Sequence, residues 1–164
     1  MEILFTYSKN EWINGRRNYL FLSRTITKMQ IVITLLFTLS LIFLFPLLKD
    51  SILYIILFFV AVLSVLLLFF LYILQPILLF YAASKYQHPY KMQFTKENIY
   101  FETLGISSVL SWNIYNDYIE SNKYFFLLQD KHNYTLIPKR VFENDDDLTK
   151  FRTILDSSLT EGDY

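Results

Sequence analysis

Cysteine is absent from this chain of 164 residues, and glycine occurs only three times. Without cysteine the chain can form no disulfide, no thiolate nucleophile and no cysteine-based metal site. The glycines are isolated from one another (Gly15, Gly105 and Gly162), so neither a phosphate-binding loop nor a dinucleotide-binding motif can be built. These absences exclude several large classes of enzyme.

Histidine is also scarce, and the other groups used in catalysis form no recognisable set. His88 and His132 both lie in predicted loops, where a solvated side chain is expected rather than a ligand or general base. The three acids from Asp145 to Asp147 could bind a hard cation, but a helix N-terminus explains them without one. No serine lies in a nucleophile elbow, and no pair of carboxylates stands out. We therefore predict a protein that is not an enzyme and uses no cofactor or metal.

Charged residues are missing from two long apolar runs, Ile31–Leu48 and Ile52–Ala83. As a helix rising about 1.5 Å per residue, the first run would span about 27 Å, close to the roughly 30 Å of a bilayer hydrocarbon core. We predict a transmembrane helical hairpin over residues 29–84, with spans at about 31–48 and 52–81. A kink is expected at Gln75-Pro76. Because neither span contains an ionisable side chain, no ion or proton pathway is expected.

Basic residues flank the predicted hairpin on the side of both chain ends. Arg16, Arg17, Arg24 and Lys28 precede it, and Lys85, Lys91 and Lys96 follow it. By the positive-inside rule, both termini of this multi-pass protein should face the cytoplasm.

The N-terminal segment, residues 1–28, contains a predicted short strand over residues 2–7. Ser8 and Glu11 fit a capping box, in which the Ser8 hydroxyl accepts from the Glu11 amide and the Glu11 carboxylate reaches back. A helix is expected to run from Lys9 towards Lys28. Its cations, Arg16 and Arg17 among them, either lie among anionic lipid headgroups or simply belong to a helical extension of the first span.

From Tyr90 the apolar residues alternate with period two, which predicts a cytoplasmic β domain over residues 85–164. The first expected strand runs from Tyr90 to Phe94. Further strands are expected at residues 99–103, 106–112, 114–121, 124–129 and 134–137. The turns between them are expected at residues 95–98, 104–105, 122–123 and 130–133. After Asn144, an apolar stripe at helical spacing predicts a C-terminal helix. The fold class is thus membrane α+β: a two-helix hairpin plus an antiparallel meander, bent into a sandwich or partial barrel. This order of elements is that of a pleckstrin-homology-like (PH-like) domain. We also predict that residues 2–7 pair with, or pack on, the sheet after Tyr90.

Three short motifs resemble the YcxB-like family of small bacterial membrane proteins: F-T-K-E-N-I (Phe94–Ile99), S-S-V-L-S-W-N-I (Ser107–Ile114) and Y-T-L-I-P-K-R-V-F (Tyr134–Phe142). The resemblance implies a two-span hairpin followed by a PH-like domain, in the bacterial cytoplasmic (inner) membrane. It implies no reaction.

Pro138-Lys139-Arg140 is the compact polar cluster that we single out as a candidate contact site. Lys139 and Arg140 follow a strand, where a loop could present them to a phosphate or to lipid headgroups. Alternatively, both are solvated, or Arg140 pairs with Glu143 or Asp147. The domain is not basic enough to predict nucleic-acid binding.

Together these features predict a non-enzymatic, membrane-anchored binding module whose domain contacts membrane lipids or an unidentified protein partner. The alternatives are an immunity or antitoxin-like protein that neutralises a toxin at the membrane, and an accessory subunit of a membrane complex. Small residues in the spans (Thr34, Thr38, Ala61 and Ser64) would also permit close helix packing, within the hairpin or in a homo-oligomer.

Overall fold

The computed structural model describes residues 1–49, 51–130 and 133–161, and these form two compact units. Residues 1–15 and the chain from Phe80 onward make up the first unit, and residues 16–79 make up the second. The first unit is therefore assembled from both ends of the chain, and the second is inserted into it in sequence.

The first sheet of the β domain contains four antiparallel strands in the order β1-β2-β3-β4. Their bounds are β1 Glu2–Phe5, β2 Tyr90–Phe94, β3 Asn98–Thr103 and β4 Ile106–Ser111. β1 pairs with β2 along its whole length, from Glu2 opposite Gln93 to Phe5 opposite Tyr90. The predicted pairing of the N-terminal strand with the later sheet is confirmed for residues 2–5, and the strand is two residues shorter than predicted.

Leu104 and Gly105 form the two-residue turn between β3 and β4, with φ of 48° and 71°. Positive φ at both positions matches the right-handed twist of a hairpin, and glycine adopts it without strain.

The second sheet has the order β7-β6-β5-β8, with β5 Asp117–Glu120, β6 Tyr124–Leu128, β7 Tyr134–Pro138 and β8 Thr160–Glu161. β8 runs parallel to β5, which corrects the expectation of a purely antiparallel sheet. The strand predicted from Ile114 begins only at Asp117, because Trp112–Ile114 forms a 3₁₀ turn (η3) instead. The indole Nε1 of Trp112 donates to the carbonyl of Thr95 at 2.9 Å, which fixes the turn against the first sheet. His132 and the centre of its predicted turn lie outside the described residues.

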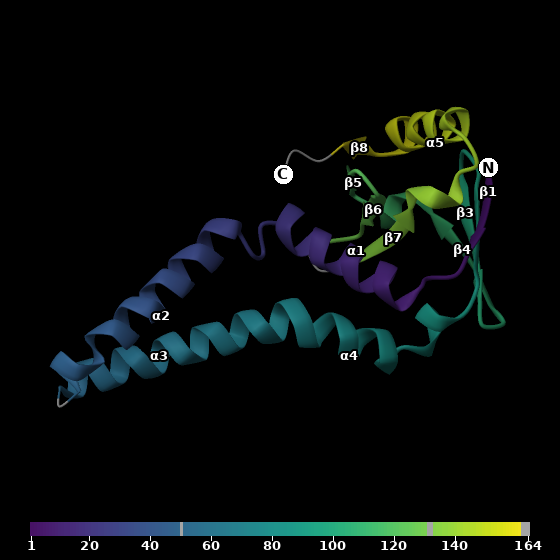
Figure 1. Cartoon of the computed structure of the whole chain (residues 1–164). Helices are drawn as coiled ribbons and strands as arrows, with labels where there is room; N and C mark the ends of the chain where they lie inside the picture. The colour runs from purple at the N-terminus through teal and green to yellow at the C-terminus, as the bar shows by residue number, and fades with distance from the viewer. Residues whose placement is uncertain (50, 131–132, 162–164) are drawn as a thin grey trace. The chain divides into compact units, whose positions relative to one another are not determined.

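The C-terminal helix α5 (Asp145–Ser158) joins the two sheets (Figure 1). It begins as predicted, since the Asn144 side chain accepts from the Asp147 amide at 2.8 Å. The ring of Phe151 lies 4.9 Å from that of Phe94 in the first sheet and 5.1 Å from that of Phe125 in the second. All three side chains are fully buried and form the centre of the core.

Helix α1 (Lys9–Leu22) is shorter than predicted. Arg24 has a φ of 53°, a left-handed conformation that interrupts a helix, so the expected continuation to Lys28 is wrong. A new helix begins at Lys28, and Thr27 and Gln30 form its capping box. The Ser8 hydroxyl does accept from the Glu11 amide, at 3.1 Å.

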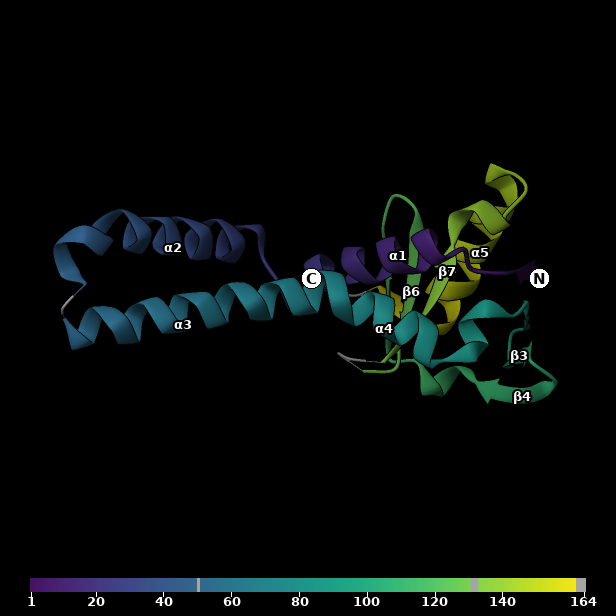
Figure 2. The ribbon, with the colours of Figure 1, turned by 60° about the horizontal axis from the view of Figure 1, so that its bottom comes forward.

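The second unit is built on two long apolar helices, α2 (Lys28–Leu48) and α3 (Ile52–Phe69), which lie side by side in both views (Figures 1 and 2). Lys28–Leu48 and the longer helical stretch Ile52–Ala82 are long and apolar enough to cross a membrane. The Tyr54 hydroxyl donates to the Leu41 carbonyl at 2.7 Å, and Ala61 is buried beside them. The small residue Ala61 thus serves packing within the hairpin. Asp50 of the predicted loop lies outside the described residues.

The helical stretch after α3 changes its geometry just before Pro76. Phe70–Leu74 forms a π-helical turn (η1), and α4 (Gln75–Ala82) follows. Proline has no amide hydrogen, and its ring crowds the carbonyl four residues earlier, which here belongs to Tyr72. The local disturbance predicted at Gln75-Pro76 is therefore a π turn on its N-terminal side.

Candidate functional site

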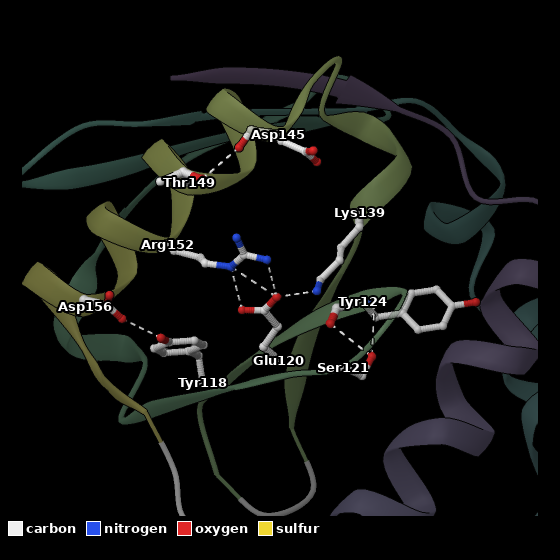
Figure 3. A network of polar contacts seen from close by, with 9 residues as sticks. All are labelled: Tyr118, Glu120, Ser121, Tyr124, Lys139, Asp145, Thr149, Arg152 and Asp156. Carbon is white, nitrogen blue, oxygen red and sulfur yellow. Dashed lines mark hydrogen bonds and ion pairs between the residues drawn. The ribbon is translucent and has the colours of Figure 1, made fainter.

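The predicted contact residue Lys139 lies in the 3₁₀ turn η4 (Lys139–Val141), directly after β7. Its ammonium group forms an ion pair with Glu120 (Figure 3). It also lies 5.0 Å from the centre of the Phe125 ring. The charge that the sequence offers to a phosphate is therefore held by a carboxylate of the same domain.

Glu120 binds a second cation, Arg152 of α5 (Figure 3). Nε and Nη2 of Arg152 donate to its two carboxylate oxygens, with nitrogen–oxygen distances of 2.8–3.2 Å. Partial burial acts to raise the pKa of Glu120, but the hydrogen bonds and charges of Arg152 and Lys139 outweigh it and hold that pKa below its ordinary value. The carboxylate in turn raises the pKa of Arg152. Glu120 thus ties β5 to both η4 and α5.

Arg140 makes the longest-range ion pair of this region, with Glu11 in α1. Its Nε and Nη2 donate to the two oxygens of Glu11 at 2.6 and 2.7 Å, and Nη2 also donates to the Thr6 carbonyl at 2.8 Å. These hydrogen bonds raise the pKa of Arg140 further above its ordinary value. The sequence-based alternative that Arg140 pairs with Glu143 or Asp147 is therefore wrong. The Glu11 carboxylate accepts from Arg140, and among the described residues no hydrogen bond from the Ser8 amide to it completes the predicted capping box.

A depression of ≈ 460 Å³ lies beside these residues. It is lined by the following side chains: Glu11, Asn14, Asn122, Lys123, Tyr124, Pro138, Lys139 and Arg140. Lys123 is exposed, and among the described residues no ion pair holds its ammonium group. With Lys139 and Arg140 both paired, the depression carries little uncompensated positive charge. Contact of Lys139 and Arg140 with lipid headgroups remains a prediction.

The other two predicted contact residues, Arg16 and Arg17, belong to the second unit. Both are partly buried in α1. Nε of Arg17 donates to the carbonyl of Tyr72 at 3.0 Å, and the guanidinium lies 4.8 Å from the centre of the Tyr72 ring. In a regular helix the amide of residue 76 would donate to this carbonyl, but proline has no amide hydrogen. Arg17 therefore satisfies a backbone acceptor that the proline leaves open.

The outer face of the first sheet is a surface that the sequence did not single out. Tyr100 of β3 lies directly opposite Val109 of β4, and the two residues are 44% and 62% exposed. A depression of ≈ 270 Å³ surrounds the pair, and Lys91 and Glu102 also line it. Alternation in β3 provided the signal, because Ile99 is fully buried in the core and its neighbour Tyr100 must then point outward.

β4 forms one edge of this sheet, and it carries no charge, no proline and no glycine. Apart from its ladder with β3, none of the backbone hydrogen bonds found in the described residues involves β4. The other edge strands are blunted by Glu2 in β1, Pro138 in β7 and the two-residue length of β8. β4 is thus an unprotected edge.

No group of three or more metal-ligating side chains occurs in the described ranges 1–49, 51–130 and 133–161. The three acids at the start of α5 lie in its first turn, where they complement the helix dipole. What this unit offers chemically is an open strand and a mixed apolar and polar sheet face, which suit peptide recognition.

The model of the family described as YcxB-like protein matches residues 94–155. This segment runs from the end of β2 into α5 and contains all three motifs on which the resemblance rested. The recognition of that family is confirmed over this segment. Comparisons with curated proteins and with solved structures found no match.

Proposed function

We propose that this chain is a non-enzymatic, membrane-anchored binding module that binds a protein partner at the β4 edge of its first sheet. The anchor is the hairpin of α2 and the helical stretch Ile52–Ala82, whose length and apolar surface suit a bilayer. By the positive-inside rule, the basic residues on both sides of the hairpin favour a β domain and both termini in the cytoplasm of a bacterial cell.

The unprotected β4 edge is the observation that carries this proposal. A strand with free backbone donors and acceptors pairs readily with another chain, and folded proteins normally block such edges. Here Ile106 and Val109 are more than half exposed on that strand, and no charged side chain opposes an incoming segment. In β-strand addition, the main chain provides affinity and the neighbouring side chains provide specificity.

An extended segment of the partner would add a fifth strand beside β4. Its outward side chains would meet the row formed by Val109, Tyr100 and Gln93, which the ladder aligns across three strands. Lys91 and Glu102, directly opposite each other in the next row, would supply polar contacts of both signs. We therefore expect a partner segment with alternating apolar and polar residues and little net charge.

Lipid headgroups are the weaker candidate for the β domain, because carboxylates already hold the charges of Lys139 and Arg140. No feature of the described residues favours the immunity-protein alternative.

Photo-crosslinking in intact cells tests the proposal. A photoreactive residue at Val109 should yield a discrete adduct, whereas the same residue at the exposed Thr149 of α5 should not. Adding Ile106→Lys to the Val109 probe should abolish the adduct, since lysine on an edge strand opposes pairing. Thr149→Lys is the matched control and should leave the adduct intact. An adduct that survives Ile106→Lys, or none at all at Val109, would overturn the proposal.

A further inference from the structure

An apolar cleft of ≈ 200 Å³ lies between the two helices of the second unit, at the end where α2 begins. Ile31 and Leu35 of α2 line one side, and Leu68, Phe69 and Tyr72 line the other. Almost all of its surface is hydrocarbon or aromatic ring. The Tyr54–Leu41 hydrogen bond joins the same two helices in their other half.

A guanidinium group contacts Tyr72, one of the residues that line this cleft. Nε of Arg17 donates to the Tyr72 carbonyl, and the guanidinium lies over the ring of the same tyrosine. Among the described residues, no hydrogen bond or ion pair is found for its two terminal nitrogens. Two parallel N–H donors of this kind match the geometry of a phosphate.

The segment that precedes α2 is basic in sequence. Residues 16–28 contain Arg16, Arg17, Arg24 and Lys28 and no acid, and Asp50 is the single acidic residue between positions 16 and 79 in the sequence. A ligand that satisfies both surfaces must combine an anionic group with a hydrocarbon chain.

We infer that this cleft is a binding site for an anionic phospholipid, with one acyl chain between α2 and the Leu68–Tyr72 segment and the phosphate on Arg17. The inference rests on the membrane anchoring in the proposed function, but not on the β4 edge. The site depends on Pro76. Because proline has no amide hydrogen, the Tyr72 carbonyl is free to accept a hydrogen bond from Arg17, and this bond positions Arg17. A charge that only sets membrane topology needs no particular contact near the membrane surface, whereas Arg17 has a defined position on Tyr72.

Native mass spectrometry of the full chain, released from detergent micelles with added lipid, tests the site. The probes are phosphatidylglycerol and phosphatidylcholine with identical acyl chains. We expect a phosphatidylglycerol adduct that phosphatidylcholine does not match. Arg17→Gln should weaken it about tenfold, the scale of a lost charge-assisted hydrogen bond. Leu35→Trp, which fills the cleft, should weaken it by a similar factor.

Two control variants separate this site from general effects. Arg24→Gln removes the same charge away from Tyr72, and Leu39→Trp adds the same bulk at an exposed position of α2 that does not line the cleft. Both should retain the adduct. Equal binding of the two lipids, equal losses in Arg17→Gln and Arg24→Gln, or an unchanged adduct in Leu35→Trp would each overturn the inference.

An alkaline wash of cell membranes distinguishes the failure of this site from the failure of the anchor. A chain that the wash releases is not anchored, and the proposed function then fails together with the lipid site. A chain that stays in the membrane but shows no preference for phosphatidylglycerol refutes the lipid site alone.

Discussion

The two sheets of the β domain differ in what lies on their outer faces. In the second sheet, every residue of β6 is buried, so both faces of that strand are covered. The N-terminal segment covers its outer face: the Tyr7 hydroxyl donates to the Leu136 carbonyl, and Tyr124 reaches the Glu11 carbonyl at 3.4 Å. The outer face of the first sheet carries exposed Tyr100 and Val109, and no described residue of this unit covers them in the same way. The comparison teaches that the start of the chain protects one sheet and leaves the other available.

Breaking the cover of the second sheet should have the largest effect. A Cβ atom at Gly15 would lie 2.5 Å from Cδ2 of Leu136, a side chain that is itself buried. Gly15→Leu should therefore lower the free energy of unfolding by about 2 kcal/mol, since overpacking outweighs the gain in helix propensity. Urea unfolding in detergent, followed by tryptophan fluorescence, measures it. Both tryptophans, Trp12 and Trp112, are buried in this unit.

The exposed neighbour Asn14 provides the control for this prediction. Asn14→Leu adds the same side chain one position earlier and should cost little stability. Equal losses in the two variants would mean that the N-terminal helix does not pack on Leu136.

The ion pairs around Glu120 should contribute an intermediate and pH-dependent effect. Its pKa is lowered in the folded state, so its contribution is fully present above the ordinary value of 4.5 and is lost as the pH falls through the lowered value. Glu120→Gln should reduce stability by about 1 kcal/mol at pH 7. It should also flatten the decline in stability below about pH 5. Urea midpoints between pH 3 and 7 measure both effects.

The partly exposed pair Lys150–Asp147 is a suitable control, because surface ion pairs contribute little. Lys150→Gln should leave both stability and its pH dependence nearly unchanged. A decline below pH 5 that is as steep in Glu120→Gln as in the unmodified chain would contradict the role given to Glu120.

Local patterns were sufficient to predict most elements of this fold. The two uncharged runs indicated the long helices, and alternation after Tyr90 indicated the strands, because burial on one face dictates the period. The β-type composition of residues 2–7 indicated the N-terminal strand, of which residues 2–5 pair with the later sheet. The limits of α1 and of β5 could not be predicted, since the left-handed Arg24 and the Trp112–Ile114 turn depend on tertiary contacts.

The site was harder to predict than the fold. Lys139 and Arg140 were identified as cations near one surface, but their partners Glu120 and Glu11 are far away in sequence. Likewise, a proline predicts a disturbed helix, yet nothing local indicates that Arg17 would bind the freed carbonyl. The β4 edge depends on strand order, which a single sequence does not specify.

The open face of the first sheet should tolerate substitution with the smallest effect on stability. Val109 is 62% exposed, so Val109→Ser removes few contacts and should change the free energy of unfolding by no more than about 0.5 kcal/mol. Leu136→Ser, on the covered outer face of the second sheet, should cost about 3 kcal/mol or more, because it leaves a cavity and buries a hydroxyl. Urea unfolding of the two variants compares the faces directly. If Val109→Ser proved as costly as Leu136→Ser, the first sheet would also be covered, and β4 would be unavailable to a partner.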